Sequence, residues 1–146
     1  GCAVSLFGRV RIFDEVYGDD NEAKGKALRA GCNHVIQSTA ADMMLIALNV
    51  IEDMMRKADL ESILVSTVHD SLLIDAVRDE LPQVHDIVFP VLNHFDTILP
   101  AVLGADFDTS WMLTPFAGDC EVGHSYYSTR KIPETNIDWD KLLSEE

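Results

Sequence analysis

The sequence is poor in cysteine, in aromatic residues and in basic residues. Its three cysteines are an odd and scattered set, which is not a disulfide framework and predicts reduced thiols in an intracellular, reducing compartment. No uninterrupted apolar run reaches the roughly 18 residues of a membrane span. The first residues also lack the basic start and apolar core of a signal peptide. These absences argue against a secreted protein, and no membrane partner is expected.

Positive charge is scarce. The 11 Lys and Arg residues stand against 25 Asp and Glu, a net charge of −14 at pH 7, which should repel a phosphate backbone. Five of the 11 basic residues nevertheless lie in the first 29 positions, beside five acidic ones. After residue 40 the chain carries 20 acidic and six basic residues. Any contact with a polyanion is therefore expected within the first 40 residues.

The hydrophobic content of 47% in 146 residues predicts about one domain with a core of its own. Residues 1–13 alternate loosely around Phe7–Gly8 and read as a short hairpin. The polar, glycine-containing stretch 17–26 reads as a loop. From about 27 to 57, apolar residues recur at spacings of three and four, which predicts a helix packed on a core.

The second half continues with strands and helices. Residues 62–77 read as strand, tight turn, strand, with both strands buried. A second helix is predicted over 82–99 with a kink or break at Pro90, and a strand over 114–122. Residues 128–146 form a polar C-terminal tail, mobile at its end. Without a βαβ rhythm, this order predicts an α+β fold with an antiparallel sheet.

Three polar residues in the first helix are regularly spaced. Arg29, Asn33 and Gln37 follow one another at i, i+4 and i+8, so they lie roughly along one helix face. They span about 12 Å, which matches roughly three to four base steps of a duplex. All three side chains donate hydrogen bonds, and the minor groove offers acceptors at every base pair. The row is compatible with reading duplex geometry without sequence, but an ordinary polar helix face has the same spacing.

The centre of the predicted hairpin reads "STVHDSLLIDA", which places His69 and Asp70 at its bend. Asp tolerates turn backbone angles, so a plain turn explains the pair. An Asp fixed between two strands is also a rigid mount for a divalent ion, as two-metal phosphoryl transfer requires. Both interpretations stand on this stretch alone.

Four segments, in order, resemble family A DNA polymerases of the DNA polymerase I type. "GCAVSLFGRVR" is similar to the family's glycine-led hairpin, and "RAGCNHVIQSTAADMM" to its R-x-x-x-N-x-x-x-Q-G-T-A-A-D helix. "VHDSLLIDAV" resembles the third polymerase motif, and "TPFAGDCEVGHSYY" the closing strand. The resemblance runs over about residues 1–127. It implies the C-terminal, palm part of a larger polymerase fold, with an antiparallel palm-type sheet and packed helices.

The resemblance implies roles for matched positions. Asp70 would be one of two aspartates that hold two Mg²⁺ ions, and the other aspartate would lie outside this chain. Arg29, Asn33, Gln37 and His69 would contact primer–template DNA. Deoxynucleoside triphosphates would be substrates. An upstream polymerase segment would supply the rest of the palm and the fingers, so this chain, a fragment or one part of a divided enzyme, would be inactive alone.

The chain departs from the family pattern at two motif positions. Ser71 stands where the family usually has Glu, and Ser38 replaces a Gly, which would affect how closely the helix approaches DNA. Residues 93–113 look like an insertion, whose Asp106 and Asp108 are expected in a solvated loop.

Two other function classes remain as alternatives. One is a metal-dependent His-Asp phosphohydrolase, which would draw further ligands from His34, His85, His94 and His124. That class places its His-Asp pair on a helix, whereas the flanks here are strand-like. The other is a non-catalytic acidic interaction domain, in which Asp70 is freely replaceable.

Overall fold

The computed structural model describes residues 1–133 and 136–144. Packing divides the chain into two compact units, one made of Gly1–Ile46 with His69–Ser71 and the other of Ala47–Val68 with Leu72–Glu146. The boundary falls inside a long helix, α1 (Asn21–Lys57). Helices and small antiparallel sheets are mixed along the chain, so the α+β class is confirmed.

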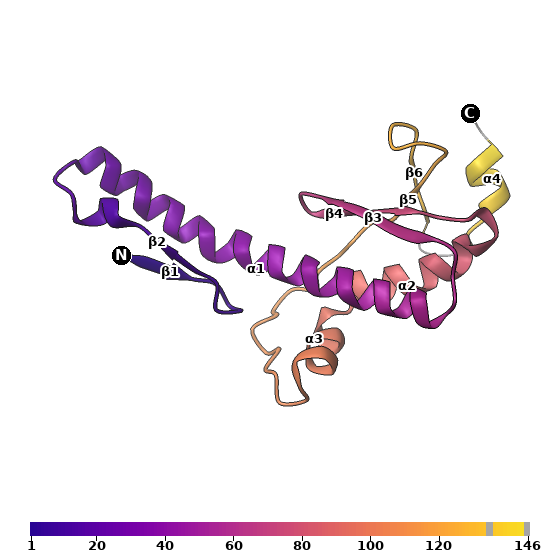
Figure 1. The fold of residues 1–146 in the computed structure, drawn as a ribbon, viewed down its shortest axis with the longest axis horizontal. Helices are drawn as coiled ribbons and strands as arrows, with labels where there is room; N and C mark the ends of the chain where they lie inside the picture. Colours follow the sequence, from indigo (N-terminus) through magenta and orange to yellow (C-terminus); the bar gives the residue numbers. More distant parts are fainter. Residues whose placement is uncertain (134–135, 145–146) are drawn as a thin grey trace. The chain divides into compact units, whose positions relative to one another are not determined.

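The first unit is a hairpin packed on the first half of α1 (Figure 1). Strands β1 (Cys2–Val4) and β2 (Val10–Ile12) pair antiparallel with Val4 opposite Val10. A short 3-10 helix, η1 (Asp14–Tyr17), leads on to α1. Phe13 is buried beside Gly31 of α1, where an added Cβ would lie 3.6 Å from the Phe13 ring. The small residue thus lets the open end of the hairpin approach the helix closely.

Helix α1 begins six residues before the predicted start, so the predicted loop over 17–26 is wrong in its second half. The Asp20 carboxylate accepts hydrogen bonds from the backbone N–H groups of Glu22 (2.8 Å) and Ala23 (3.3 Å). Asp20 is therefore an N-cap that satisfies two otherwise unpaired donors of the first turn. The polar composition that indicated a loop is that of a capped helix start.

The second hairpin consists of β3 (Ile63–Val68) and β4 (Ser71–Asp75). The prediction that both strands are buried is wrong: five of the six residues of β3 are exposed, and no residue of β4 is fully buried. The reason is that, among the described residues, no third strand pairs with this hairpin. A two-stranded ribbon cannot bury its own faces.

The base of this hairpin is fixed by polar contacts. Glu80 ends the 3-10 helix η2 (Arg78–Glu80), and its carboxylate accepts hydrogen bonds from the Ser62 hydroxyl (2.6 Å) and from the Glu61 and Ser62 N–H groups. The Ser62 hydroxyl in turn accepts from the Val77 N–H (2.9 Å). The residues that lead into β3 and out of β4 are thereby held together.

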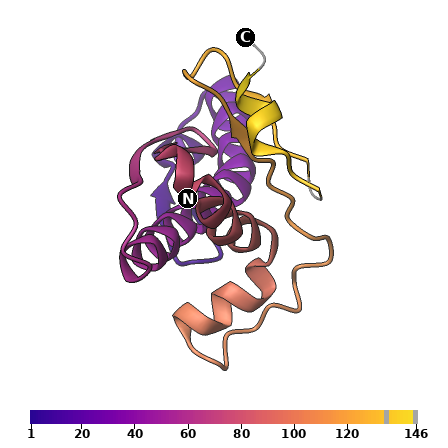
Figure 2. The ribbon, with the colours of Figure 1, turned by 90° about the vertical axis from the view of Figure 1, so that its right-hand side faces the viewer.

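The helix predicted over 82–99 is two helices. α2 (Leu81–Asn93) continues past Pro90, and the break falls at His94. α3 (Phe95–Leu103) then turns away, with an angle of 88° across the break (Figure 2). Pro90 has no N–H to bond within the helix, which weakens the turn before the break. The core of the second unit is the set of buried apolar residues Ala47, Ile51, Met55, Leu81, Val84, Ile87, Val88, Val91, Phe95, Leu99 and Ile132.

The C-terminal part is more structured than expected. Of the strand predicted over 114–122, only β5 (Glu121–Val122) is formed, paired antiparallel with β6 (Arg130–Lys131). The tail also contains α4 (Trp139–Ser144), whose Trp139 ring meets the buried His85 edge-on at 5.8 Å. Aromatic contact thus fixes α4 on α2. The end of the tail predicted as mobile, 145–146, lies outside the described residues.

Strands β1 to β6 form three separate two-stranded sheets within the described part of the chain, rather than the single palm-type sheet expected. Each hairpin is short and local in sequence. A larger sheet needs further strands on at least one of these open edges.

One helix is long and apolar enough to cross a membrane by length and composition alone, namely α1. α2 and α3 pass the same test only when they are taken together across their bend. The sequence search required an uninterrupted apolar run and therefore missed α1, in which polar residues are spread along the helix. Length and composition alone are weak evidence for a membrane span, because core helices of soluble proteins also pass this test.

Candidate nucleic-acid interface

The polar row of α1 is exposed. Arg29, Asn33 and Gln37 all lie on the solvent side of the helix, in its first half. Within residues 1–133 and 136–144, none of the three side chains has a hydrogen-bond or ion-pair partner. Their donors are therefore available to an outside acceptor, as the predicted role requires.

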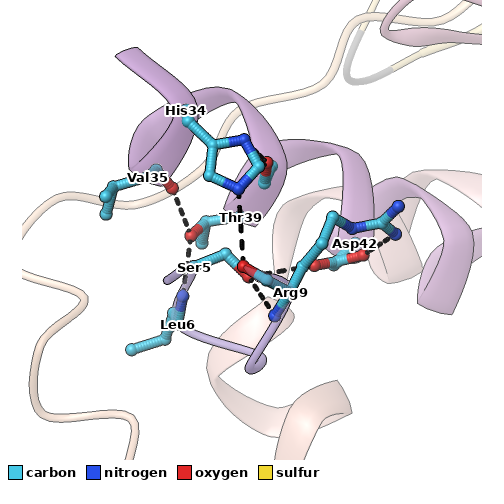
Figure 3. A network of polar contacts seen from close by, with 8 residues as sticks. Ser5, Leu6, Arg9, His34, Val35, Thr39 and Asp42 are labelled. Atoms are coloured by element: carbon cyan, nitrogen blue, oxygen red, sulfur yellow. Dashed lines mark hydrogen bonds and ion pairs between the residues drawn. The ribbon is translucent and has the colours of Figure 1, made fainter. Parts of the chain in front are cut away.

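A second polar row lies next to the first and has a different use. His34, Ser38 and Asp42 also follow one another at i, i+4 and i+8. His34 and Ser38 each directly follow a residue of the exposed row, and Asp42 follows Ala41, the next position at the same spacing. One residue corresponds to about 100° of rotation around the helix. His34 and Asp42 contact the turn of the β1–β2 hairpin, residues 5–9 (Figure 3), and Ser38 bonds to His34 between them. Sequence reasoning missed this row, although its spacing is the signal that identified the other.

The contact between the hairpin turn and α1 contains an ion pair between Arg9 and Asp42, and the Ser5 hydroxyl bonds to both residues. The Arg9 guanidinium donates to one carboxylate oxygen of Asp42. The Ser5 hydroxyl donates to the other oxygen at 3.4 Å and accepts from the Arg9 N–H at 3.0 Å. The hydrogen bond with Asp42 raises the pKa of Arg9 above its ordinary value. The carboxylate side chain of Asp42 is only 14% exposed, so its charge is satisfied mainly inside the protein.

Two further contacts join the same turn to α1. The Thr39 hydroxyl accepts from the Leu6 N–H at 3.2 Å and donates to the Val35 carbonyl at 2.7 Å. The Ser38 hydroxyl lies 2.8 Å from His34 Nδ1, which can accept its hydrogen bond. His34 Nε2 lies 3.4 Å from the Arg9 carbonyl oxygen, to which it can donate. A donating Nε2 and an accepting Nδ1 describe one neutral tautomer of the imidazole.

Ser38 has a defined place in this contact. Its side chain is buried and bonded to His34, on the hairpin side of α1. It therefore lies about 100° around the helix from Gln37. The Ser38 hydroxyl is bonded to His34, and its effect on how closely the helix approaches DNA stays a prediction.

The His69–Asp70 pair forms the bend between β3 and β4, and both side chains are exposed. His69 has a positive φ of 56°, in the left-handed region. Sequence reasoning assigned the tolerance of turn angles to Asp70, but the residue that needs it is His69. Histidine is one of the few residues enriched in that region. The bend belongs to the same compact unit as the exposed row.

The Asp70 carboxylate fits a divalent ion as one oxygen ligand, because it is charged, exposed and held at a tight bend. In the described parts of the chain, no three His, Cys, Asp or Glu side chains come together as a metal site. Any further carboxylate, imidazole or thiolate cluster around an ion at Asp70 is therefore not supplied by the described residues alone. Asp75, at the far end of β4, is likewise exposed.

The residues considered for a phosphohydrolase site are dispersed. His85 is buried against the Phe89 ring at 5.3 Å, and His124 bonds the Leu143 carbonyl at 2.9 Å. His34 serves the hairpin contact, and His94 stands at the break between α2 and α3. With the His69–Asp70 pair on a hairpin bend rather than a helix, this geometry does not support that class.

The Asp106 and Asp108 carboxylates lie in an exposed loop after α3, as expected. Asp108 accepts a hydrogen bond from the Ser110 N–H at 2.9 Å, which lowers the pKa of its carboxyl. Such a bond across two residues is ordinary turn chemistry.

The chain belongs to DNA polymerase family A, whose family model matches residues 1–112. The match includes both hairpins and all of α1. The helix that is long enough for a membrane therefore lies within the polymerase-like sequence. The closing segment at 114–127 lies beyond the match, so its resemblance stays a prediction.

Individual relatives point the same way. The DNA polymerase I of Pseudomonas aeruginosa is 27% identical over 112 residues, which are 76% of this chain and 12% of the relative. The DNA polymerase I of Caldicellulosiruptor bescii is 33% identical over 88 residues, 60% of this chain and 10% of the relative. The DNA polymerase of Bacillus phage SP01 is 32% identical over 80 residues, 55% of this chain and 9% of the relative. The chain thus spans about a tenth of the length of these relatives.

A solved structure is similar as well. It is the POL domain of Pol1 from M. smegmatis in complex with DNA primer-template and dNTP, with 27% identity and a TM-score of 0.59. The likeness covers 62% of this chain and 16% of that chain. This chain is therefore similar in both sequence and fold to one part of a polymerase domain.

Proposed function

We propose that this chain is the C-terminal palm portion of a template-directed DNA polymerase, which adds deoxynucleotides to a primer. The observation that carries the proposal is the exposed donor row Arg29–Asn33–Gln37 in the same compact unit as the Asp70 bend. Family membership adds weight, since relatives named DNA polymerase I match over both features.

In this proposal the chain supplies two functions to the reaction. Arg29, Asn33 and Gln37 donate hydrogen bonds to minor-groove acceptors of the primer–template duplex, which positions the primer end without reading sequence. His69 donates to the duplex next to that end. Asp70 holds Mg²⁺ with its carboxylate, together with an aspartate from the upstream polymerase segment. Bound Mg²⁺ activates the attacking hydroxyl and stabilises charge on the transferred phosphoryl group.

The chain is proposed to need the upstream segment for activity, because a single carboxylate does not make a two-metal clamp. We infer a reducing compartment for the protein as well. Its cysteines are free among the described residues, and Cys2 and Cys32 are exposed, so a reducing environment suits them.

The test is primer extension with Mg²⁺, using this chain with and without the upstream polypeptide from the same source. Asp70→Asn should abolish nucleotide incorporation and leave primer–template binding nearly unchanged, because the charge serves the metal. Asp75→Asn is the matched control, since it removes an exposed carboxylate from the other end of β4.

Extension only by the combined wild-type and Asp75→Asn proteins would support the proposal. Equal extension by Asp70→Asn would overturn the metal assignment. No extension in any combination would favour the acidic interaction domain, in which Asp70 is a turn residue.

A further inference from the structure

The first half of α1 depends on the hairpin for its support. Helix residues that carry the donor row are exposed, and helices in proteins gain most of their stability from tertiary packing rather than from intrinsic propensity. The open end of the hairpin packs Phe13 and Ala3 near Gly31 of α1. Its turn end is fixed to Thr39 and Asp42. The donor row lies along the helix segment that these contacts support.

The turn end is held by several polar contacts. The turn itself contains Gly8 at a φ of 84°, with open space around it, and the side chain of Leu6 is half exposed. The Phe7 side chain is partly buried, so the polar contacts fix this end together with some apolar area. Asp42 makes two of its contacts, one to Arg9 and one to Ser5, and it is the least exposed charged group among them.

We propose that Asp42 is a positioning residue for primer–template binding, because it fixes the hairpin turn against α1 and so holds the donor row straight. Asp42 itself does not touch the duplex, since its carboxylate faces Arg9 and Ser5 (Figure 3). Arg9 and Ser5 act in the same way, from the hairpin side. The inference rests on the proposed function, in which the donor row binds the duplex.

The experiment measures two quantities on the complete polymerase assembly: the dissociation constant for a fluorescent primer–template, and the incorporation rate at saturating DNA. Asp42→Ala should raise the dissociation constant about threefold to tenfold, the range for losing a hydrogen bond of ordinary net strength. The rate at saturating DNA should change less than about twofold, because no group at the reacting atoms is altered.

Three further variants separate positioning from simple destabilisation. Glu22→Gln is the matched control, because it removes a carboxylate that pairs with Lys26 at 2.8 Å on the same helix without touching the hairpin. The double swap Arg9→Asp/Asp42→Arg restores the ion pair with reversed polarity and should recover most of the lost affinity. Asp42→Asn retains the shape of the side chain and should show amide hydrogen exchange faster than wild type over 27–42.

The outcomes are distinguishable. Weaker DNA binding by Asp42→Ala, recovery in the double swap and wild-type behaviour of Glu22→Gln would support the inference. A dissociation constant for Asp42→Ala equal to that of Glu22→Gln would overturn it and leave the proposed function in place. If the wild-type assembly neither binds nor extends the primer, the proposed function and this inference fail together.

Discussion

At the scale of single residues, α1 shows that equal spacing does not mean equal use. Gln37 and Ser38 are neighbours in sequence, yet Gln37 faces solvent and Ser38 is buried and bonded to His34. A helix turns about 100° per residue, so one position decides which row a side chain joins. Substitutions at these two sites should therefore have unrelated effects.

Gln37→Ala should weaken primer–template binding in the complete assembly by about 1 kcal/mol, the net strength of one hydrogen bond. The loss should be the same for any base pair at the primer end, because minor-groove acceptors occur at every pair. Fluorescence titrations against four duplexes that differ only in that pair measure it. A strong dependence on the base pair would contradict minor-groove binding by this side chain.

At the scale of elements, the β3–β4 hairpin is held at its base and open elsewhere. Glu80 accepts three hydrogen bonds there, first from the Ser62 hydroxyl and then from backbone N–H groups. These bonds lower the pKa of the Glu80 carboxyl below its ordinary value. The folded protein therefore favours the charged form of this side chain.

Glu80 should make the free energy of unfolding depend on pH in the acidic range. Because its folded-state pKa is depressed, its contribution is present above the unfolded-state pKa of about 4.3 and is lost as pH falls through the folded-state value. Urea unfolding at pH 7 and in steps below about pH 4.5 should show a smaller acid-induced loss in Glu80→Gln than in wild type. Asp79→Asn, an exposed neighbour in η2, is the control. A slope with pH that is identical in wild type and Glu80→Gln would contradict this role.

The sequence predicts where helices and strands lie along the chain better than it predicts what packs against them. Hydrophobic periodicity indicated α1, and β-branched residues around a polar bend indicated β3–β4. Periodicity carries no information about what covers a strand, so β3 was expected to be buried although Ile63 and Val65 are exposed. The residues around Asp20 predict a loop although they form the N-cap of α1, because Asp and Gly are common both in loops and at helix N-termini.

The candidate site was predictable where one helix face or one turn holds it. Spacing places Arg29, Asn33 and Gln37 on one helix face and strand-like flanks place Asp70 at a bend, whereas their predicted roles toward DNA and Mg²⁺ come from the resemblance to family A polymerases. The contact of Asp42 with Arg9 joins residues 33 positions apart. Local patterns cannot predict such a pair, because it depends on how the hairpin folds back on α1.

At the scale of the whole molecule, charge limits what the chain does alone. A net charge of −14 opposes association with a polyanion, although the donor row is exposed. The isolated chain should therefore bind primer–template weakly, and the binding should weaken further as salt is added. Fluorescence titration at two salt concentrations tests this. Tight, salt-resistant binding by the chain alone would show that the contact surface lies elsewhere.

The exposed β3 strand has a further consequence for the behaviour of the protein in a test tube. Ile63 and Val65 present apolar side chains on a two-stranded ribbon, and an open strand edge is a template for pairing with other chains. Mutual repulsion between highly negative molecules keeps such edges apart near neutral pH. That repulsion vanishes near the isoelectric point of about 4.5. Turbidity and thioflavin binding should then rise together as pH approaches this value, because β3, which pairs only with β4 among the described residues, finds a second neighbouring strand in another molecule.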